Sequence, residues 1–192
     1  MADALALIKL AEERGNQLRE PHSKALGDGL YELRGKQVRM FYVFGPGRRV
    51  VTLLSGIIKK RDRIPESALR QAQRFKSRLE GEAGLRVKKT AFMAWVDRKI
   101  KSDPGLKKMV QENLAEMRLE QELAALRARR GMTQKELAAR MGVSQPVIAK
   151  LESGRVKNLK LRTLSRWTTA LGGQLKIAVE TNNRRQAKTG SR

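Results

Sequence analysis

The stretch TQKELAARMGVSQPVIAKLESG, residues 133–154, decides the fold of the second half of the chain. Thr133, followed three residues later by Glu136, predicts a capping box at the start of a short helix. Gly142 predicts the end of that helix, because glycine readily adopts the left-handed conformation of a tight turn. A second short helix after this turn would complete a helix-turn-helix, the motif that places its second helix in the major groove of DNA.

The second helix is expected over residues 145–152, with Ser144 as its cap and Gly154 at its end. Its inner face would carry the apolar side chains of Val147, Ile148 and Leu151. The opposite face would project four side chains outward, namely Gln145, Pro146, Ala149 and Lys150. The alternative interpretation is an ordinary helical hairpin within a globular core.

The order TQ..LA...GVSQ..I..LE.G resembles the Xre-type, Cro-repressor-like DNA-binding domain, and the resemblance covers roughly residues 114–171. It implies a site of five residues: phosphate contacts from Gln134 and Ser144, a base contact from Gln145, a guanine or phosphate contact from Lys150, and an altered contact at Pro146. The family often has a small polar residue where Pro146 stands. An amide at Gln145 suits adenine, to which glutamine binds through two hydrogen bonds.

The composition favours a polyanionic partner. The chain of 192 residues has a formal net charge of +23, and residues 85–192 contribute +16 of it. Basic surfaces bind nucleic acid through counterion release, whereas no basic amphipathic segment favours the competing partner, an anionic membrane. The chain has no cysteine and one histidine, so neither a disulfide nor a Cys or His metal site is expected, and no cofactor is expected. No membrane span or signal pattern is apparent, which predicts a cytoplasmic protein.

The first part of the chain changes from helical to strand periodicity and back. Residues 2–13 predict a helix and residues 16–28 mostly a connection. An antiparallel meander is expected next, because glycine-containing turns separate three β-branched and aromatic runs, residues 30–34, 38–44 and 50–54. Pro65 then opens a helix over residues 66–79.

The elements GLYELR, VRMFYVF and VVTLLSGIIKKRDRIP resemble the RelE/HigB superfamily of toxins, most closely its HigB-like branch. The family cuts messenger RNA on the ribosome without metal. The resemblance implies a basic RNA surface made of Arg34, Arg39, Lys59, Lys60 and Arg61. Arg34 and Lys60 are the first candidates for a phosphate clamp within it. The alternative is a set of solvated surface charges. Two departures from the family pattern are a missing Tyr or His after the basic pair and a short N-terminus, so the sheet is expected to lack an edge strand.

Residues 83–91 are polar and contain glycine, which predicts a linker between a first domain, residues 1–82, and a second, residues 92–180. The second domain resembles HigA-like antitoxins. Its expected elements beyond the helix-turn-helix are helices over residues 92–100, from residue 104 and over 160–171, and a C-terminal strand over 174–180. The basic tail, residues 181–192, is expected to be disordered.

Together these patterns predict an α+β chain in which a small RelE-like antiparallel sheet with helices precedes an all-α Xre-type domain. The primary hypothesis is a toxin-antitoxin fusion that represses its own operator as a dimer on palindromic DNA, with messenger RNA and the ribosome as partners of the toxin half. One alternative is a repressor whose toxin-like domain is catalytically dead and serves packing or oligomerisation. Another is a ribonuclease that is active in the intact chain.

Overall fold

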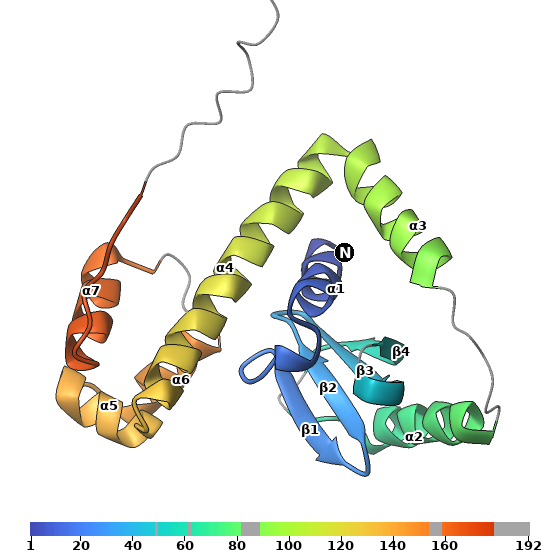
Figure 1. The fold of residues 1–192 in the computed structure, drawn as a ribbon, viewed down its shortest axis with the longest axis horizontal. Helices are drawn as coiled ribbons and strands as arrows, with labels where there is room; N and C mark the ends of the chain where they lie inside the picture. Colours follow the sequence, from blue (N-terminus) through green and yellow to red (C-terminus); the bar gives the residue numbers. More distant parts are fainter. Residues whose placement is uncertain (49, 61–62, 82–88, 154–158, 179–192) are drawn as a thin grey trace, which may run out of the picture.

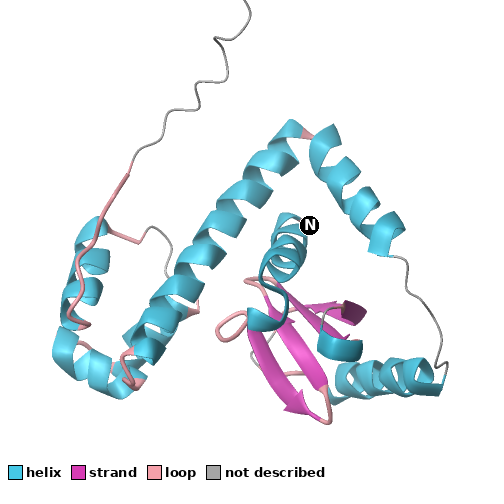
Figure 2. Ribbon diagram, viewed as in Figure 1, coloured by secondary structure: helices cyan, strands magenta, loops and turns pink. Residues whose placement is uncertain are grey.

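The structure, a computed structural model, describes residues 1–48, 50–60, 63–81, 89–153 and 159–178 (Figure 1). It has a mixed fold in which a four-stranded antiparallel sheet with helices is followed by a helical domain (Figure 2). Arg61 and Gly154, which the sequence singled out, lie outside the described residues.

The sheet is a meander with the strand order β1-β2-β3-β4. Its strands are β1 (Ser23–Gly27), β2 (Leu30–Arg34), β3 (Val38–Phe44) and β4 (Val51–Ile58). Strand β1 corrects two expectations: residues 16–28 are not mostly a connection, and the sheet has an edge strand before β2. The pairing of β1 with β2 shifts register between Ala25 and Gly27, so the strand lacks the regular alternation that would reveal it in the sequence.

Two helices cover opposite faces of this sheet, because successive strand residues point to opposite sides. Helix α1 (Ala2–Arg14), which continues into the short 3-10 helix η1 (Gly15–Gln17), packs on the face that carries Met40 and Tyr42. Helix α2 (Glu66–Gly81) packs on the other face, around Phe41. A second short 3-10 helix, η2 (Pro46–Arg48), lies between β3 and β4.

The first turn of α1 is fastened to the turn between β2 and β3. The buried carboxylate of Asp3 accepts hydrogen bonds from the backbone N–H groups of Lys36 at 3.1 Å, Gln37 at 2.7 Å and Val38 at 3.2 Å. A Cβ atom added at Gly35 would lie 2.6 Å from Oδ2 of Asp3. Glycine at this position therefore permits the close approach of the carboxylate to the turn.

The next two helices are α3 (Lys89–Ser102) and α4 (Pro104–Arg129), which form a hairpin around α1 (Figure 1). The apolar side chains of the hairpin join the core of α1 and the sheet, and the buried ones are Val96, Leu106, Val110, Leu114 and Met117. Residues 1–82 and 92–180 therefore share a core. Sequence periodicity identified these helices, but it does not say against which element their apolar faces pack.

Ion pairs surround this apolar contact between α4 and the first domain. Arg118 of α4 contacts both carboxylate oxygens of Glu13, at 2.5 and 3.0 Å. Arg14 lies 2.9 Å from Glu122, and Lys36 pairs with Glu116. Because all three pairs are partly exposed, they contribute orientation more than stability.

The C-terminal end of α4 enters a second core that belongs to the helical domain. This domain also contains α5 (Gln134–Met141), α6 (Gln145–Glu152) and α7 (Leu161–Ala170). Trp167 is buried in its centre with Leu137, Ile148 and Leu171, as expected of a core residue. The strand expected over residues 174–180 is not formed in residues 174–178, and the last two residues lie outside the described ones. A segment without a sheet neighbour has no partner for its backbone groups, which explains the difference.

Candidate nucleic-acid interface

The capping box at the start of α5 is present. The side chain of Thr133 accepts a hydrogen bond from the backbone N–H of Glu136, and the carboxylate of Glu136 accepts one from the backbone N–H of Thr133 at 2.7 Å. These hydrogen bonds lower the pKa of Glu136, first through the backbone N–H and then through the hydroxyl of Thr133. Gly142 ends the helix in the left-handed conformation, with φ of 61° and ψ of 39°. The two short helices and their turn are thus set as the sequence predicts.

The second helix of the motif, α6, presents its polar face to solvent. Ile148 and Leu151 are buried as expected, but Val147 is 39% exposed and does not belong to the inner face. Ser144 is the N-cap residue by position, although its side chain makes no capping hydrogen bond. An unused hydroxyl at this position is free to serve an external phosphate. Three further residues predicted to contact DNA are exposed, namely Gln145, Pro146 and Lys150.

A polar chain behind the exposed face fixes the first of these residues. The side-chain amide of Gln145 donates to the amide oxygen of Gln134 at 2.8 Å, and Gln134 donates to the carboxylate of Glu152 at 2.8 Å. Glu152 is 3% exposed and accepts two hydrogen bonds from Arg127 at 2.5 and 3.0 Å. Arg127 also donates to the backbone oxygen of Met132 at 2.6 Å. The chain orients the Gln145 amide before any ligand arrives.

In the first domain, residues 1–82, which we call the sheet domain, the two arginines predicted to face RNA are cross-strand partners. Arg34 ends β2 and pairs in register with Arg39 near the start of β3. Between them lies Glu32, which is 0% exposed and whose carboxylate contacts Nε of Arg34 at 2.9 Å and Nη1 of Arg39 at 2.5 Å. Arg39 is 6% exposed, so Arg34 is the more accessible of the two. A buried carboxylate shared by two guanidinium groups fixes their positions and neutralises part of their charge.

The predicted lysines follow β4 and line a cleft between the end of that strand and the start of α2. This α2 cleft, of about 1240 Å³, contains five cations and one carboxylate among its described lining residues: Arg39, Lys59, Lys60, Arg63 and Arg74, with Glu66. The structure therefore brings Arg39, Lys59 and Lys60 together on one basic surface. Arg74 of α2 also lies there.

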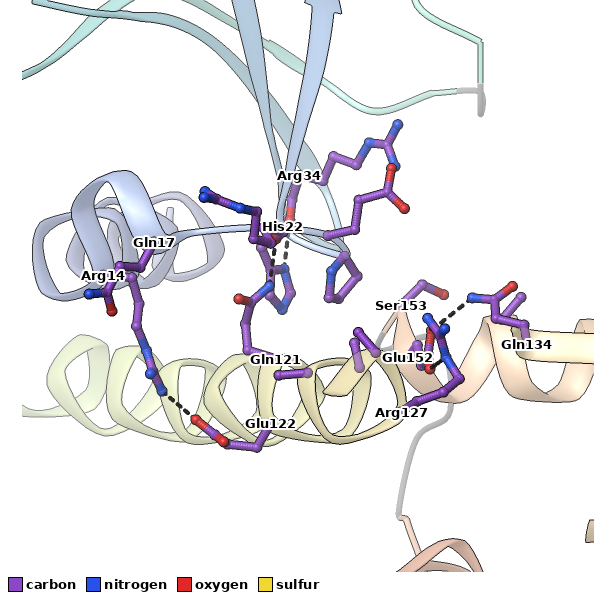
Figure 3. Close-up of a pocket in the computed structure, with 18 of the residues that line it drawn as sticks. Arg14, Gln17, His22, Arg34, Gln121, Glu122, Arg127, Gln134, Glu152 and Ser153 are labelled. Carbon is purple, nitrogen blue, oxygen red and sulfur yellow. Dashed lines mark hydrogen bonds and ion pairs between the residues drawn. The ribbon is translucent and has the colours of Figure 1, made fainter. Parts of the chain in front are cut away.

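A second cleft, the interdomain cleft, separates the sheet domain from the helix-turn-helix and has a volume of about 890 Å³. Figure 3 shows Arg34 on its sheet side and Gln134, Arg127 and Glu152 opposite. Residues of both domains line this cleft. On the sheet side they include Arg19, Arg34, Arg39 and Lys59, and on the opposite side Arg127, Gln134, Ala149 and Glu152. Because Arg39 and Lys59 line both clefts, the two clefts meet at this pair.

The floor of the interdomain cleft is formed where α4 meets the segment before β1. The side-chain amide of Gln121 donates to the backbone oxygen of Arg19 at 2.6 Å. Nε2 of His22 lies 2.9 Å from the carboxylate of Glu120, and both side chains are more than 90% buried. His22 therefore serves the contact between the two domains at the edge of the interdomain cleft, which it also lines.

The sequence motifs include Glu32 and Glu152 without indicating what they do, and Arg127 was not singled out. Glu32 stands in the GLYELR stretch and Glu152 in the LE.G stretch, so the signal for both was an acidic residue at an otherwise apolar inward position.

Tyr42 is 1% exposed, as expected of a core residue, and burial raises the pKa of its hydroxyl, which lies 2.8 Å from that of Ser23. Among the described residues, no cluster of three or more His, Asp or Glu side chains could hold a metal ion. None of the described helices combines the length and the apolar character that crossing a membrane requires.

Two protein families match the chain, one in each domain. Residues 1–77 match the family described as phage derived protein Gp49-like (DUF891), and residues 123–176 match a helix-turn-helix family. No solved structure matches significantly.

Two relatives come from Mycobacterium tuberculosis. The putative antitoxin HigA3 is 40% identical over 73 residues, which are 38% of this chain and 67% of the relative. Antitoxin HigA1 is 34% identical over 93 residues, which are 48% of this chain and 62% of the relative. The chain thus spans about two thirds of the length of these relatives. With its Gp49-like domain and its helix-turn-helix, the chain is a DNA-binding protein that belongs to the HigA antitoxin family.

Proposed function

We propose that this chain is a toxin and its antitoxin in one polypeptide, and that it represses its own operator. The likeness to HigA antitoxins and the helix-turn-helix support the antitoxin half. The exposed polar face of α6 supports sequence reading, with the base contact from Gln145 and phosphate contacts from Gln134, Ser144 and Lys150. Xre-type domains read two half-sites about one helical turn apart, so the proposed operator is palindromic and the proposed assembly is a homodimer.

In this proposal the sheet domain is a RelE/HigB-like ribonuclease that cuts messenger RNA on the ribosome. The arrangement of β2, β3 and the end of β4 supports it, because these elements gather Arg34, Arg39, Lys59 and Lys60 around the two clefts. Cleavage would proceed by attack of a ribose 2′-hydroxyl on the adjacent phosphate. The cations would neutralise the additional negative charge of the transition state.

The proposal rests on the packing of α4, which belongs to the cores of both domains. Its first half lies along α1 in the core of the sheet domain, and its second half holds the helix-turn-helix across the interdomain cleft from Arg34 and Lys59. The antitoxin half thereby restricts the space in front of the proposed RNA surface.

The test uses the whole chain, because α1 shares its core with α3 and α4 and a fragment without them loses that core. Reversing three charges of α4 opposite the sheet domain, with Glu116→Lys, Arg118→Glu and Glu122→Arg, should release the ion-paired contact of α4 and leave the shared apolar core intact. Hydrogen exchange of α1 verifies the release. In a cell-free translation extract the released variant should cleave messenger RNA and the intact chain should not.

Two matched variants make this result specific. Adding Arg34→Ala and Lys60→Ala to the released variant should abolish cleavage, whereas adding Lys101→Ala and Lys108→Ala, which lie outside both clefts, should not. A released, folded variant that leaves messenger RNA intact contradicts the nuclease. Cleavage by the unaltered chain would instead support a ribonuclease that is active in the intact protein.

The surroundings of the basic residues favour a second candidate function, a repressor with an inactive toxin-like domain. Glu32 offsets part of the charge of Arg34 and Arg39. The His22 side chain contacts Glu120, and Tyr42 is buried beneath α1. No His or Tyr side chain among the described residues lines the α2 cleft. Under this candidate the sheet domain serves the helix-turn-helix as a platform, and release produces no cleavage.

A further inference from the structure

One edge of the helix-turn-helix, whose second helix α6 is the proposed recognition helix, faces the sheet domain across the interdomain cleft. Gln134 and Ala149, which belong to the face that the helix-turn-helix offers to DNA, line the interdomain cleft. Across that cleft lie Arg34, Arg39 and Lys59 at the ends of β2, β3 and β4. A duplex seated on the recognition helix therefore meets the basic end of the sheet as its neighbour.

The two walls have a fixed relation to each other. Helix α4 is continuous from Pro104 to Arg129, with its first half in one core and its last turns in the other. The hydrogen bond from Gln121 to the backbone of Arg19 fastens the helix to the sheet domain at the floor of the cleft. A continuous helix, and not an extended linker, thus connects the helix-turn-helix to the basic residues of the sheet domain.

The charge of this surface suits a sugar-phosphate backbone. The described lining residues of the two clefts include ten Lys or Arg side chains and four Glu side chains. Because Arg39 and Lys59 line both clefts, the cations of the two clefts lie on adjoining parts of one surface. Duplex DNA carries one phosphate charge per roughly 1.7 Å of its axis, so a backbone that crosses this surface meets several cations.

We propose that the sheet domain is part of the DNA interface: the backbone of the operator leaves the recognition helix and continues over Arg34 and Lys59 to Lys60 and Arg63 in the α2 cleft. These contacts add affinity without sequence preference. The proposal needs only DNA binding by the helix-turn-helix and stands whether or not the sheet domain is a nuclease. If the proposed nuclease is correct, operator DNA and RNA compete for one surface, and bound DNA keeps the nuclease blocked.

The experiment begins by selecting a high-affinity 40-base-pair duplex from a random library with the intact chain. Its binding to the unaltered chain and to the Lys60→Ala, Arg63→Ala double variant is then measured by fluorescence anisotropy between 50 and 200 mM salt. Each phosphate contact contributes about 0.9 to the slope of log affinity against log salt. The double variant should therefore lower the slope by about 1.8 and leave the ratio of selected to random DNA affinity unchanged.

A matched control removes two charges elsewhere. Lys101 and Lys108 are exposed on the α3–α4 hairpin and line neither cleft, so their double alanine variant lowers the net charge equally. It should keep the slope of the unaltered chain. Equal slopes for both double variants would overturn the proposal, as would a hydroxyl-radical footprint of the duplex that is the same with and without Lys60 and Arg63.

Discussion

Nε2 of His22 and the carboxylate of Glu120 face each other at 2.9 Å where the sheet domain meets α4. On the other side of the ring, Nδ1 lies 2.9 Å from the backbone oxygen of Arg34. A carbonyl oxygen only accepts, so Nδ1 donates to it, and Nε2 is the ring atom that faces Glu120. The pair thus links α4 to the backbone of a residue in the proposed RNA surface.

Replacing Glu120 should show that this link stabilises the contact between the domains. Glu120→Ala leaves the buried imidazole without its partner, which should lower the free energy of unfolding by about 1–3 kcal/mol. Glu120→Gln can donate an amide hydrogen to Nε2 and should cost less than half as much. Urea titration measures both, with the exposed Glu112→Ala on the same helix as the control. Equal losses for Gln and Ala would show that the polar contact with His22 is not what stabilises the junction.

Arg127 neutralises the buried carboxylate that supports the helix-turn-helix. The Arg127→Met variant leaves Glu152 buried without a cation and should lower the free energy of unfolding by about 3 kcal/mol or more. Arg129→Met, two residues along the same helix and exposed, should change it by less than about 0.5 kcal/mol. Differential calorimetry distinguishes the two, and similar losses in both variants would contradict this role of Arg127.

The capping box at Thr133 makes a pH-dependent contribution. Because the folded pKa of Glu136 lies below its ordinary value of 4.5, its stabilising effect is fully present above that value and disappears as the pH falls through the lowered folded pKa. The difference in stability between the unaltered chain and Glu136→Gln should therefore be constant from pH 6 to 8 and shrink in strong acid. Thr133→Ala removes the cap itself and should cost about 1 kcal/mol at neutral pH. A Glu136→Gln difference that does not vary with pH would exclude the carboxylate as its source.

The amide pair of Gln134 and Gln145 should determine how well the chain discriminates between DNA sequences. Gln145→Ala removes the proposed base contact and should reduce affinity for selected DNA by roughly tenfold to a hundredfold, with a small effect on random DNA. Gln134→Ala should reduce the same ratio less, because it removes the orienting partner and one phosphate contact. Anisotropy titrations measure both ratios, with the exposed Gln111→Ala as the control. A Gln145→Ala loss that is equal on selected and random DNA would refute base reading.

Much of the helical domain could be predicted from its sequence because its determinants are local. Thr133 and Glu136 lie within one turn of each other, and Gly142 acts through its own backbone conformation. Val147 shows the limit of this reasoning: its spacing suits the inner face, yet the short helix leaves it 39% exposed. Which apolar side chains an eight-residue helix buries depends on its neighbours.

The candidate site was less predictable, because its geometry depends on contacts that are distant in sequence. The basic residues of β2 and β4 could be identified from the motif, but the burial of Glu32 between Arg34 and Arg39 follows from strand register. Strand β1 was hidden by its irregular pairing with β2. The packing of α4 on α1, which creates the interdomain cleft, has no signal within either helix alone.

The shared core of α1, α3 and α4 has a consequence for how such a protein could arise and be divided. The apolar side chains and ion pairs described between the two halves come from residues on either side of the connecting peptide, residues 82–88. Hydrolysing one peptide bond there should leave two chains that migrate as a single heterodimer. The two halves encoded as adjacent reading frames would then assemble into the same complex. The peptide link between them would ensure equal amounts of both halves and would not be needed to hold them together.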